Sequence, residues 1–456
     1  MKYILKKMRN KRIFILFILT LVAFIPDNNI QENEFPLFRV VIDPGHGGVF
    51  LDNRNIHGDK FDMITAKYLN DFAPGAEYKG IYEKEVVYSI ALKTINLLSY
   101  CSKEGNFEEF KKILKKYTDS SIKKIYIQTI ISRRESITKN EAIKSVDPNA
   151  DYRLYDFPGP DGDMVKGRIS KMNDFKPHLV VSLHLAASAP SDYLGMNGII
   201  APPYNVLKKG LLRLQSNETE RTLNDNDILR SWFRISDKVS ARYVFFEDSA
   251  QYFTSFGITK NYKTDYNDFN GYKYNMVTWR YSDKPLWDLE AEKHPSNTRY
   301  ASDFNSFREE GSFWEREKSV FEEYRRGTGF NDFGGDNYHA TYEIIKYILL
   351  SVKESGVSHK DKVPGKPFIS TWSVPMLVNA ISAYIELGYL DRKWDRDILL
   401  SRQDQIAEGV AVGIYSLLAG VDNVKGKFKS KPSGKSIDLE RYKITPEKSY
   451  FDIVTE

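Results

Sequence analysis

The chain has 456 residues, of which 41% are hydrophobic and 28% are charged, so it can bury a real core and is neither disordered nor fibrous. Its length suits one large domain with insertions or two to three ordinary domains, and its single cysteine, Cys101, excludes an internal disulfide framework and a cysteine-based zinc module. The net charge of +5 comes from the first 12 residues, which hold six Lys and Arg and no acid; the remaining 60 basic and 61 acidic residues nearly balance and do not indicate a nucleic-acid partner.

The N-terminus has the pattern of an export signal. Residues 13–24 (IFILFILTLVAF) follow the basic stretch and carry no charge. As a helix they would rise about 18 Å, which is less than the roughly 30 Å of a bilayer core. No clear cleavage site follows, so residues 1–25 are predicted to be a signal peptide or an N-terminal anchor, and residues 26–36 a linker. We expect an exported protein of the periplasm or cell envelope that meets the membrane only through this segment.

The first half of the chain predicts alternating strands and helices. Residues 38–42 (FRVVI) form a β-branched run that ends at the glycine-rich loop 43–48 (DPGHGG), and residues 51–79 read as a long loop. From Glu83 onward, apolar residues recur at helical spacing to Leu98. A second helix is predicted over 106–117, a strand over 125–131, a helix over 164–175, and strands over 179–183 and 198–201.

The second half begins with a change of composition. Residues from about 205 to 335 are rich in Asn, Asp, Tyr and Phe and are predicted to be an insertion, with one helix over 307–326. Helices over 342–352 and 403–418 and a strand over 383–389 follow, and residues 421–456 read as a polar C-terminal tail. Strands that alternate with helices predict an α/β domain over 37–420, with a mostly parallel sheet flanked by helices and a large insertion.

Three polar residues lie where such a sheet binds ligands, at the carboxyl ends of strands, and a fourth opens a helix. His46 and His184 follow two predicted strands, Glu386 lies near the end of a third, and Glu83 opens a helix. Two histidines and a carboxylate suit catalytic zinc, which takes three protein ligands. Because the residues are far apart in sequence, their spacing does not show that they meet. Each histidine can instead be a hydrogen-bonded core or rim residue, and Glu83 can be a helix-capping charge. His178 is a reserve ligand, and His57, His294, His339 and His359 are interpreted as structural or surface residues.

Other catalytic motifs are absent from the sequence. There is no paired-histidine metalloprotease helix, no phosphate-binding loop and no serine nucleophile elbow. Cys101 has no neighbouring histidine that would activate a thiol.

Four segments in order carry a family resemblance: 40–48 (VVIDPGHGG), 80–93 (GIYEKEVVYSIALK), 178–188 (HLVVSLHLAAS) and 381–400 (ISAYIELGYLDRKWDRDILL). They resemble the signatures of zinc-dependent N-acetylmuramoyl-L-alanine amidases of the bacterial cell-separation type. The resemblance implies a twisted, mostly parallel sheet and one Zn²⁺ per chain held by His46, Glu83 and His184. It also implies that Glu386 is the catalytic glutamate and that peptidoglycan is the substrate, cut between N-acetylmuramic acid and L-alanine.

The chain departs from the family pattern at several positions. His46 and Glu83 are 37 positions apart, which is longer than usual, so Glu85 is a reserve ligand. Leu-Ala-Ala follows His184, and Asp391-Arg392 replaces Ser-Asn in the last motif. Some relatives carry an inhibitory helix that a divisome activator removes. The helix predicted over 307–326 is a candidate for that role, and a cleft wall or surface decoration is its alternative.

Two other functions compete with the leading one. The first is a non-catalytic wall-binding or regulatory relative of the same fold. All four expected positions are filled, which argues against the loss of catalysis. The second is a zinc amidase that acts on free muropeptides. Because it needs the same metal site, composition does not distinguish it from an amidase that acts on peptidoglycan.

Overall fold

The computed structural model describes residues 35–51, 58–59, 61–62, 67–68, 72–187, 195–200, 333–356, 368–369, 374–426 and 430–452. The predicted signal or anchor 1–25, nearly all of the linker 26–36, most of the insertion 205–335 and the predicted helix 307–326 lie outside the described residues. The chain divides into two units, Met1–Leu37 and Phe38–Glu456, and the second unit holds all of the described helices.

A six-stranded sheet organises the described residues, in the order β11-β10-β12-β9-β1-β6. Its strands are β1 (Leu37–Pro44), β6 (Tyr126–Ile131), β9 (Leu179–Ala186), β10 (Asn197–Ile200), β11 (Phe368–Ile369) and β12 (Ile381–Tyr389). β9 is parallel to both β1 and β12, whereas β10 is antiparallel to β12 and parallel to β11. The prediction of a mostly parallel sheet is confirmed, and the carboxyl ends of β1, β9 and β12 lie side by side.

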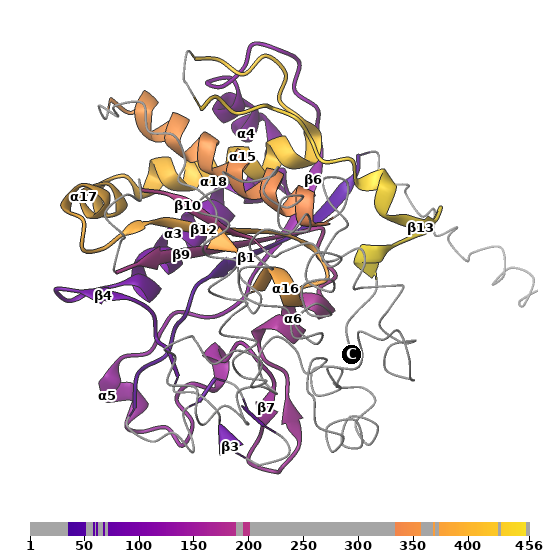
Figure 1. Ribbon diagram of the computed structural model, residues 1–456. Helices are drawn as coiled ribbons and strands as arrows, with labels where there is room; N and C mark the ends of the chain where they lie inside the picture. The colour runs from indigo at the N-terminus through magenta and orange to yellow at the C-terminus, as the bar shows by residue number, and fades with distance from the viewer. Residues whose placement is uncertain are drawn as a thin grey trace, which may run out of the picture. The chain divides into compact units, whose positions relative to one another are not determined.

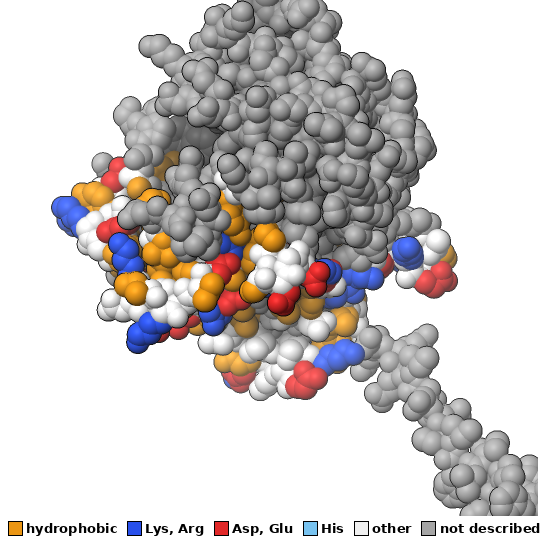
Figure 2. Space-filling view, turned by 90° about the horizontal axis from the view of Figure 1, so that it is seen from below, with side chains coloured by type: hydrophobic (Ala, Val, Ile, Leu, Met, Phe, Trp, Pro, Cys, Tyr) orange, Lys and Arg blue, Asp and Glu red, His pale blue; other side chains and the backbone are white. Residues whose placement is uncertain are grey.

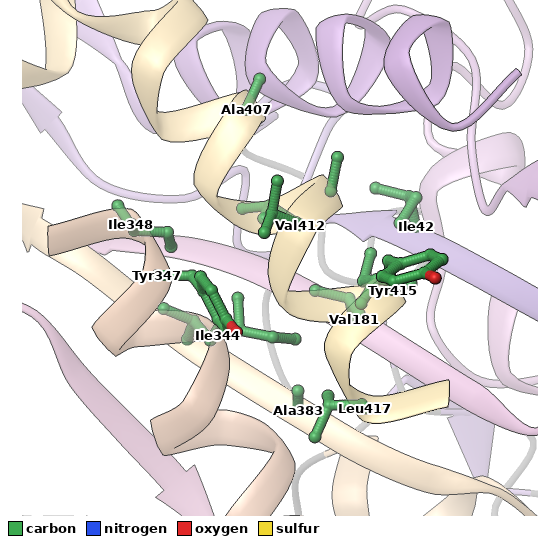
Figure 3. Close-up of a cluster of buried hydrophobic side chains, with 14 of the residues drawn as sticks. Ile42, Val181, Ile344, Tyr347, Ile348, Ala383, Ala407, Val412, Tyr415 and Leu417 are labelled. Atoms are coloured by element: carbon green, nitrogen blue, oxygen red, sulfur yellow. The ribbon is translucent and has the colours of Figure 1, made fainter. Parts of the chain in front are cut away.

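The hydrophobic core lies on one face of the sheet, because side chains alternate between the two faces of a strand. Ile42, Val181 and Ala383 are direct partners across β1, β9 and β12, and each is fully buried. Figure 3 shows them beside side chains of α15 (Phe333–Glu354) and α18 (Gln403–Ala419), and α18 in turn contacts α3 (Glu83–Leu98). This face is covered by helices and is apolar.

Two glycines bring α18 close to α15. A Cβ atom on Gly409 would lie 2.4 Å from the Cα atom of Ile348, and one on Gly413 would lie 2.9 Å from that of Ile344. The spacing of four places both glycines on one face of α18. A glycine in a helix interior costs about 1 kcal/mol relative to alanine, and here the close packing of the two helices offsets that cost.

The opposite face of the same strands carries polar side chains. Asp43 and Tyr384 are both register partners of Ser182, and Glu386 is the partner of His184. The short helices α6 (Arg168–Asp174) and α16 (Val374–Leu377) lie on this side, below the sheet in Figure 1. These polar side chains of β1, β9 and β12 therefore lie on the other side of the sheet from the helix-covered core.

The other described elements are short and surround this framework. The helices are α4 (Phe107–Leu114), α5 (Lys139–Ala142) and α17 (Lys393–Ser401). Antiparallel strand pairs are β2–β3 (Phe61–Asp62, Lys67–Tyr68), β4–β5 (Glu77–Tyr78, Ile81–Tyr82), β7–β8 (Phe157–Pro158, Met164–Val165) and β13–β14 (Lys443–Thr445, Lys448–Ser449). β2, β3 and β4 lie within residues 51–79, which the sequence predicts as a long loop, and β5 follows directly after it.

Every strand and helix predicted within the described residues is present, but two helices begin elsewhere. α15 begins at Phe333 rather than near 342, because Asn337 in its first turns is held by tertiary contact: its Oδ1 atom accepts a hydrogen bond of 2.7 Å from the Ser382 amide. α6 begins at Arg168 rather than at 164, because residues 164–165 pair with 157–158 and Gly167 is an extended N-cap residue.

The C-terminal segment 430–452 packs against the core, although the sequence sets it apart as part of a polar tail. Tyr442 and Phe451 are buried in the same cluster as the sheet residues. The carboxylate of Glu343 on α15 accepts hydrogen bonds from the amides of Ser433 at 2.9 Å and Gly434 at 2.6 Å. Two buried aromatic side chains and two hydrogen bonds to Glu343 thus hold a segment whose overall composition is polar.

The described residues on the lower face of the molecule have side chains of mixed character. In Figure 2, which views the molecule from below, basic and acidic side chains are interspersed among hydrophobic ones. Among the described residues, none of the helices has the length and apolar character that crossing a bilayer requires.

Candidate metal centre

Three candidate ligands come together at the carboxyl end of the parallel strands. His46 follows β1, Glu83 is the first residue of α3, and His184 lies on β9. His46 Nε2 lies 3.6 Å from Glu83 Oε2, and His184 Nδ1 lies 3.1 Å from Glu83 Oε1. One possible ligand atom from each residue lies within 4.8 Å of the other two, and no other group of this kind occurs among the described residues.

The glycine-rich loop after β1 places His46 beside β9. The amide of Gly45 donates a hydrogen bond of 2.8 Å to Leu183 O, directly before His184. A Cβ atom on Gly45 would lie 2.4 Å from Cε1 of the His184 ring, so only glycine leaves room for that imidazole. His46 itself has a φ angle of 57°, in the left-handed region that non-glycine residues rarely adopt.

Backbone amides outside α3 hold both carboxylate oxygens of Glu83. The backbone N–H of Glu83 donates to Ala76 O at 2.9 Å, and its Oε2 atom accepts from the Ala76 amide at 2.6 Å. Its Oε1 atom accepts from the Leu185 amide at 2.8 Å. A carboxylate in the first turn is also favoured by the helix dipole, so the group is fixed in its ionised form before any metal binds.

Neighbouring groups orient the two imidazole rings. His46 Nδ1 lies 2.9 Å from Ala73 O, and since a carbonyl only accepts, Nδ1 is the donor and Nε2, which lies 3.6 Å from Glu83 Oε2, is the nitrogen placed to bind a metal. The His184 ring stacks on Tyr384, with ring centroids 4.3 Å apart and an interplanar angle of 13°. Such outer contacts fix the tautomer and orientation that a metal ligand needs.

Electrostatics also favour metal binding. Burial alone would raise the pKa of Glu83, but His46, His184 and the Ala76 amide hold that pKa below its usual range. Burial lowers the pKa of His184. At neutral pH the site therefore offers a carboxylate and a neutral imidazole, which are the forms that bind metals. Two nitrogens and one carboxylate oxygen can hold a divalent metal ion.

Glu386 lies beside the three ligands without belonging to their group. It is the register partner of His184 on the adjacent strand β12. Its side chain is half-buried, and its Oε2 atom is buried with no hydrogen-bond partner among the described residues. Burial and the Glu83 carboxylate raise the pKa of Glu386 well above its usual range. This carboxyl group can therefore accept or release a proton next to a bound metal.

The reserve candidates lie elsewhere. Glu85 is exposed on the outer side of α3. His178 is half-buried before β9, at the other end of the strand from His184, and its Nδ1 atom accepts a hydrogen bond of 3.0 Å from the Arg39 amide. His339 bonds to Lys435 O at 3.0 Å. The remaining histidines, at positions 57, 294 and 359, lie outside the described residues.

The structure adds a buried network that the sequence does not predict. Asp43 accepts hydrogen bonds from Ser182 Oγ at 2.5 Å and from Ser132 Oγ, and forms an ion pair with Arg168. Burial alone would raise the pKa of Asp43, but Arg168 and the two serines lower it to about 2. Asp43 belongs to the glycine-rich DPGHGG motif, which could have drawn attention to it in the sequence. No sequence pattern marks Ser132 or Arg168.

Known amidases are found among the solved structures to which this chain is similar. An N-acetylmuramoyl-L-alanine amidase from Clostridium difficile 630 is 15% identical with a TM-score of 0.31, over 83% of this chain and 96% of that chain. An N-acetylmuramyl-L-alanine amidase from Mycobacterium smegmatis is 12% identical with a TM-score of 0.33, over 83% and 94% of the two chains. The CwlD amidase from Clostridioides difficile, solved with the GerS lipoprotein, is 14% identical with a TM-score of 0.28, over 83% and 96%.

No family model and no curated protein matches the chain. The case for a function therefore stands on the residues of the site.

Proposed function

We propose that this chain is a zinc-dependent N-acetylmuramoyl-L-alanine amidase. It hydrolyses the amide between N-acetylmuramic acid and L-alanine in peptidoglycan, during cell-wall remodelling or daughter-cell separation. The observation that carries the proposal is the group of His46, Glu83 and His184 beside Glu386, whose buried Oε2 atom has no partner among the described residues. The four sequence segments that resemble this family support the choice of substrate.

His46, Glu83 and His184 would hold one zinc ion per chain. Three protein ligands are typical of catalytic zinc, whose fourth position stays open to solvent or substrate. Zinc bound there supplies Lewis acidity towards the amide carbonyl and a water molecule of lowered pKa. The preformed hydrogen bonds of Glu83 and the orienting contacts of both imidazoles reduce the rearrangement that binding requires.

Glu386 is the proposed general base and general acid. Its carboxylate takes a proton from the attacking water as the water oxygen bonds to the lactyl carbonyl carbon. The same group then returns that proton to the alanine nitrogen as the carbon–nitrogen bond breaks, which leaves a lactyl carboxylic acid and a free amine. A raised pKa makes Glu386 a stronger base than an ordinary glutamate, as this exchange requires.

The test uses the full-length chain on purified peptidoglycan, with mass spectrometry of released peptides. We expect free stem peptides with an N-terminal L-alanine amine, lost on chelation and restored by added zinc. Glu386→Gln should still bind zinc but lose at least about 100-fold in rate, because the amide cannot exchange the proton. If Glu386→Gln released stem peptides at the same rate as the parent, the role assigned to Glu386 would be refuted.

A matched pair of substitutions on α3 tests the ligand assignment. Glu83→Gln removes a buried carboxylate from the metal group and should abolish zinc binding, whereas Glu85→Gln changes an exposed side chain and should leave binding intact.

Two outcomes would favour the alternative functions. If the chain binds zinc but cleaves only free muropeptides, the alternative substrate is favoured. Neither zinc binding nor peptide release would favour a non-catalytic wall-binding relative.

Export and partners are part of the same proposal. Residues 1–25 would direct the chain across the membrane, and fractionation of cells that express the full chain would locate it. A divisome activator protein is the proposed partner, and a gain in peptide release when such a protein is added would support it.

A further inference from the structure

Two buried arginines bond to the backbone that carries His46. Arg133 and Arg168 are each only 3% exposed. Arg133 donates from Nε to Pro44 O at 2.9 Å and from Nη2 to Gly45 O at 3.1 Å. Arg168 donates from Nη2 to Pro44 O at 2.9 Å and from Nη1 to His46 O at 3.0 Å. Three successive carbonyl groups, at positions 44 to 46, are therefore held by guanidinium donors.

Arg133 also reaches the segment that carries Glu83. Its Nη2 atom donates to Lys84 O at 2.7 Å, and its guanidinium carbon lies 5.1 Å from the centre of the Tyr88 ring on the next turn of α3. One planar group thus joins the residue before His46 to the residue after Glu83. The distance between these two candidate ligands is set by that bridge as well as by the sheet.

The His46 loop needs such support because its backbone conformation is unfavourable. A left-handed φ angle in a non-glycine residue persists only when surrounding contacts fix it. The Gly45 amide ties the loop to β9 through Leu183 O, but that bond acts before His46. In contrast, Arg133 donates to the carbonyl of Gly45, and Arg168 donates to the carbonyl of His46 itself.

The cost of burying these charges argues against a purely stabilising role. Both guanidinium groups are removed from water, and burial and the neighbouring Arg168 lower the pKa of Arg133. Well-packed apolar residues of similar volume often stabilise an interior as well as buried charges do, or better. A lysine could not replace either residue, since only the guanidinium fork presents several fixed donors in one plane.

We propose that Arg133 and Arg168 are positioning residues for the metal centre, which hold the backbone on either side of His46 and, through Arg133, join it to the turn that carries Glu83. The inference rests on the proposed function, because it requires a metal ion at His46, Glu83 and His184.

The test measures zinc affinity of the full-length chain by competition with a chromogenic chelator, beside denaturant unfolding of the metal-free protein. Arg133→Lys should weaken zinc binding by about 10- to 100-fold, the usual effect of losing an outer contact to a metal ligand. The matched control is Arg153→Lys, which alters an arginine that is also fully buried and that bonds to Gly58 O and Asp147. The control should lose stability but stay within about twofold of the parent in zinc affinity.

The outcomes separate this inference from the proposed function. If the parent binds zinc and Arg133→Lys binds it equally well, or if Arg153→Lys weakens it as much, the positioning role is wrong and the proposed function stands. If the parent binds no zinc, both are overturned. If metal-free Arg133→Lys does not fold, Arg168→Lys carries the same test. It loses the contact to His46 O and should weaken zinc binding, and unchanged affinity would overturn the inference.

Discussion

Replacing Gly45 by alanine tests the metal centre by steric means. A Cβ atom there would lie 2.4 Å from Cε1, 2.5 Å from Nδ1 and 2.7 Å from Nε2 of the His184 ring. Gly45 is not among the glycines with a positive φ angle, so its backbone accepts alanine and the conflict is with the ring alone. Ordinary contact to a Cβ atom begins at 3.4 Å, so the ring must move by about 1 Å.

The ring has little freedom to make that movement. It stacks on Tyr384 at 4.3 Å between centroids, and its Nδ1 atom lies 3.1 Å from Glu83 Oε1. A shift of that size would misalign His184 with the other two ligands. We expect zinc affinity to fall by about 10- to 100-fold. Overpacking should also lower the free energy of unfolding by about 1–3 kcal/mol.

A second glycine separates the loss of zinc binding from the loss of stability. A Cβ atom on Gly198 would lie 2.4 Å from Cγ2 of Thr341 on α15, which is an equally severe overlap on the helix-covered face. Gly198→Ala should therefore lower stability while zinc affinity, measured by chelator competition, stays near that of the parent. The reasoning is refuted if Gly45→Ala binds zinc as the parent does, or if Gly198→Ala weakens binding equally.

Two further predictions concern stability. The pKa of Asp43 is lowered from 3.8 to about 2 in the folded chain, so its ionisation stabilises the fold above pH 4, and about 2 kcal/mol is lost as the pH falls towards 2. Denaturant unfolding between pH 6 and 2 checks this against Asp43→Asn, and identical pH dependence in the two proteins would contradict it. Glu343→Ala removes the acceptor of the Ser433 and Gly434 amides and should cost about 2 kcal/mol. Hydrogen exchange should then speed up at both amides, and unchanged protection would show that other contacts hold the C-terminal segment.

The sequence determined the local structure of the described residues well. Runs such as 38–42 and 179–183 predict buried strands because both faces of a parallel strand are covered. The start of α3 at Glu83 was also predictable, since an acidic first turn and helical spacing of apolar residues occur together there. Each of these signals acts over a few neighbouring residues, which is why composition and periodicity reveal it.

Helix α15 and the C-terminal segment show where local signals fail. Glycine, aspartate and asparagine at the start of α15 are poor helix formers, and a contact from Asn337 to β12 outweighs their propensity. Residues 430–452 are polar on average, yet Tyr442 and Phe451 anchor them in the core. Average composition does not show which few side chains a tertiary surface will bury.

The candidate site divides in the same way. The sequence alone identified His46, Glu83, His184 and Glu386 as chemically suitable residues at the ends of predicted elements. Only the tertiary structure decided that they meet, because His46 and His184 are 138 positions apart and are joined through the parallel register of β1, β9 and β12. The contacts of Arg133 and the unpartnered oxygen of Glu386 likewise depend on strand register and burial. These are properties of the assembled sheet, and no short stretch of sequence encodes them.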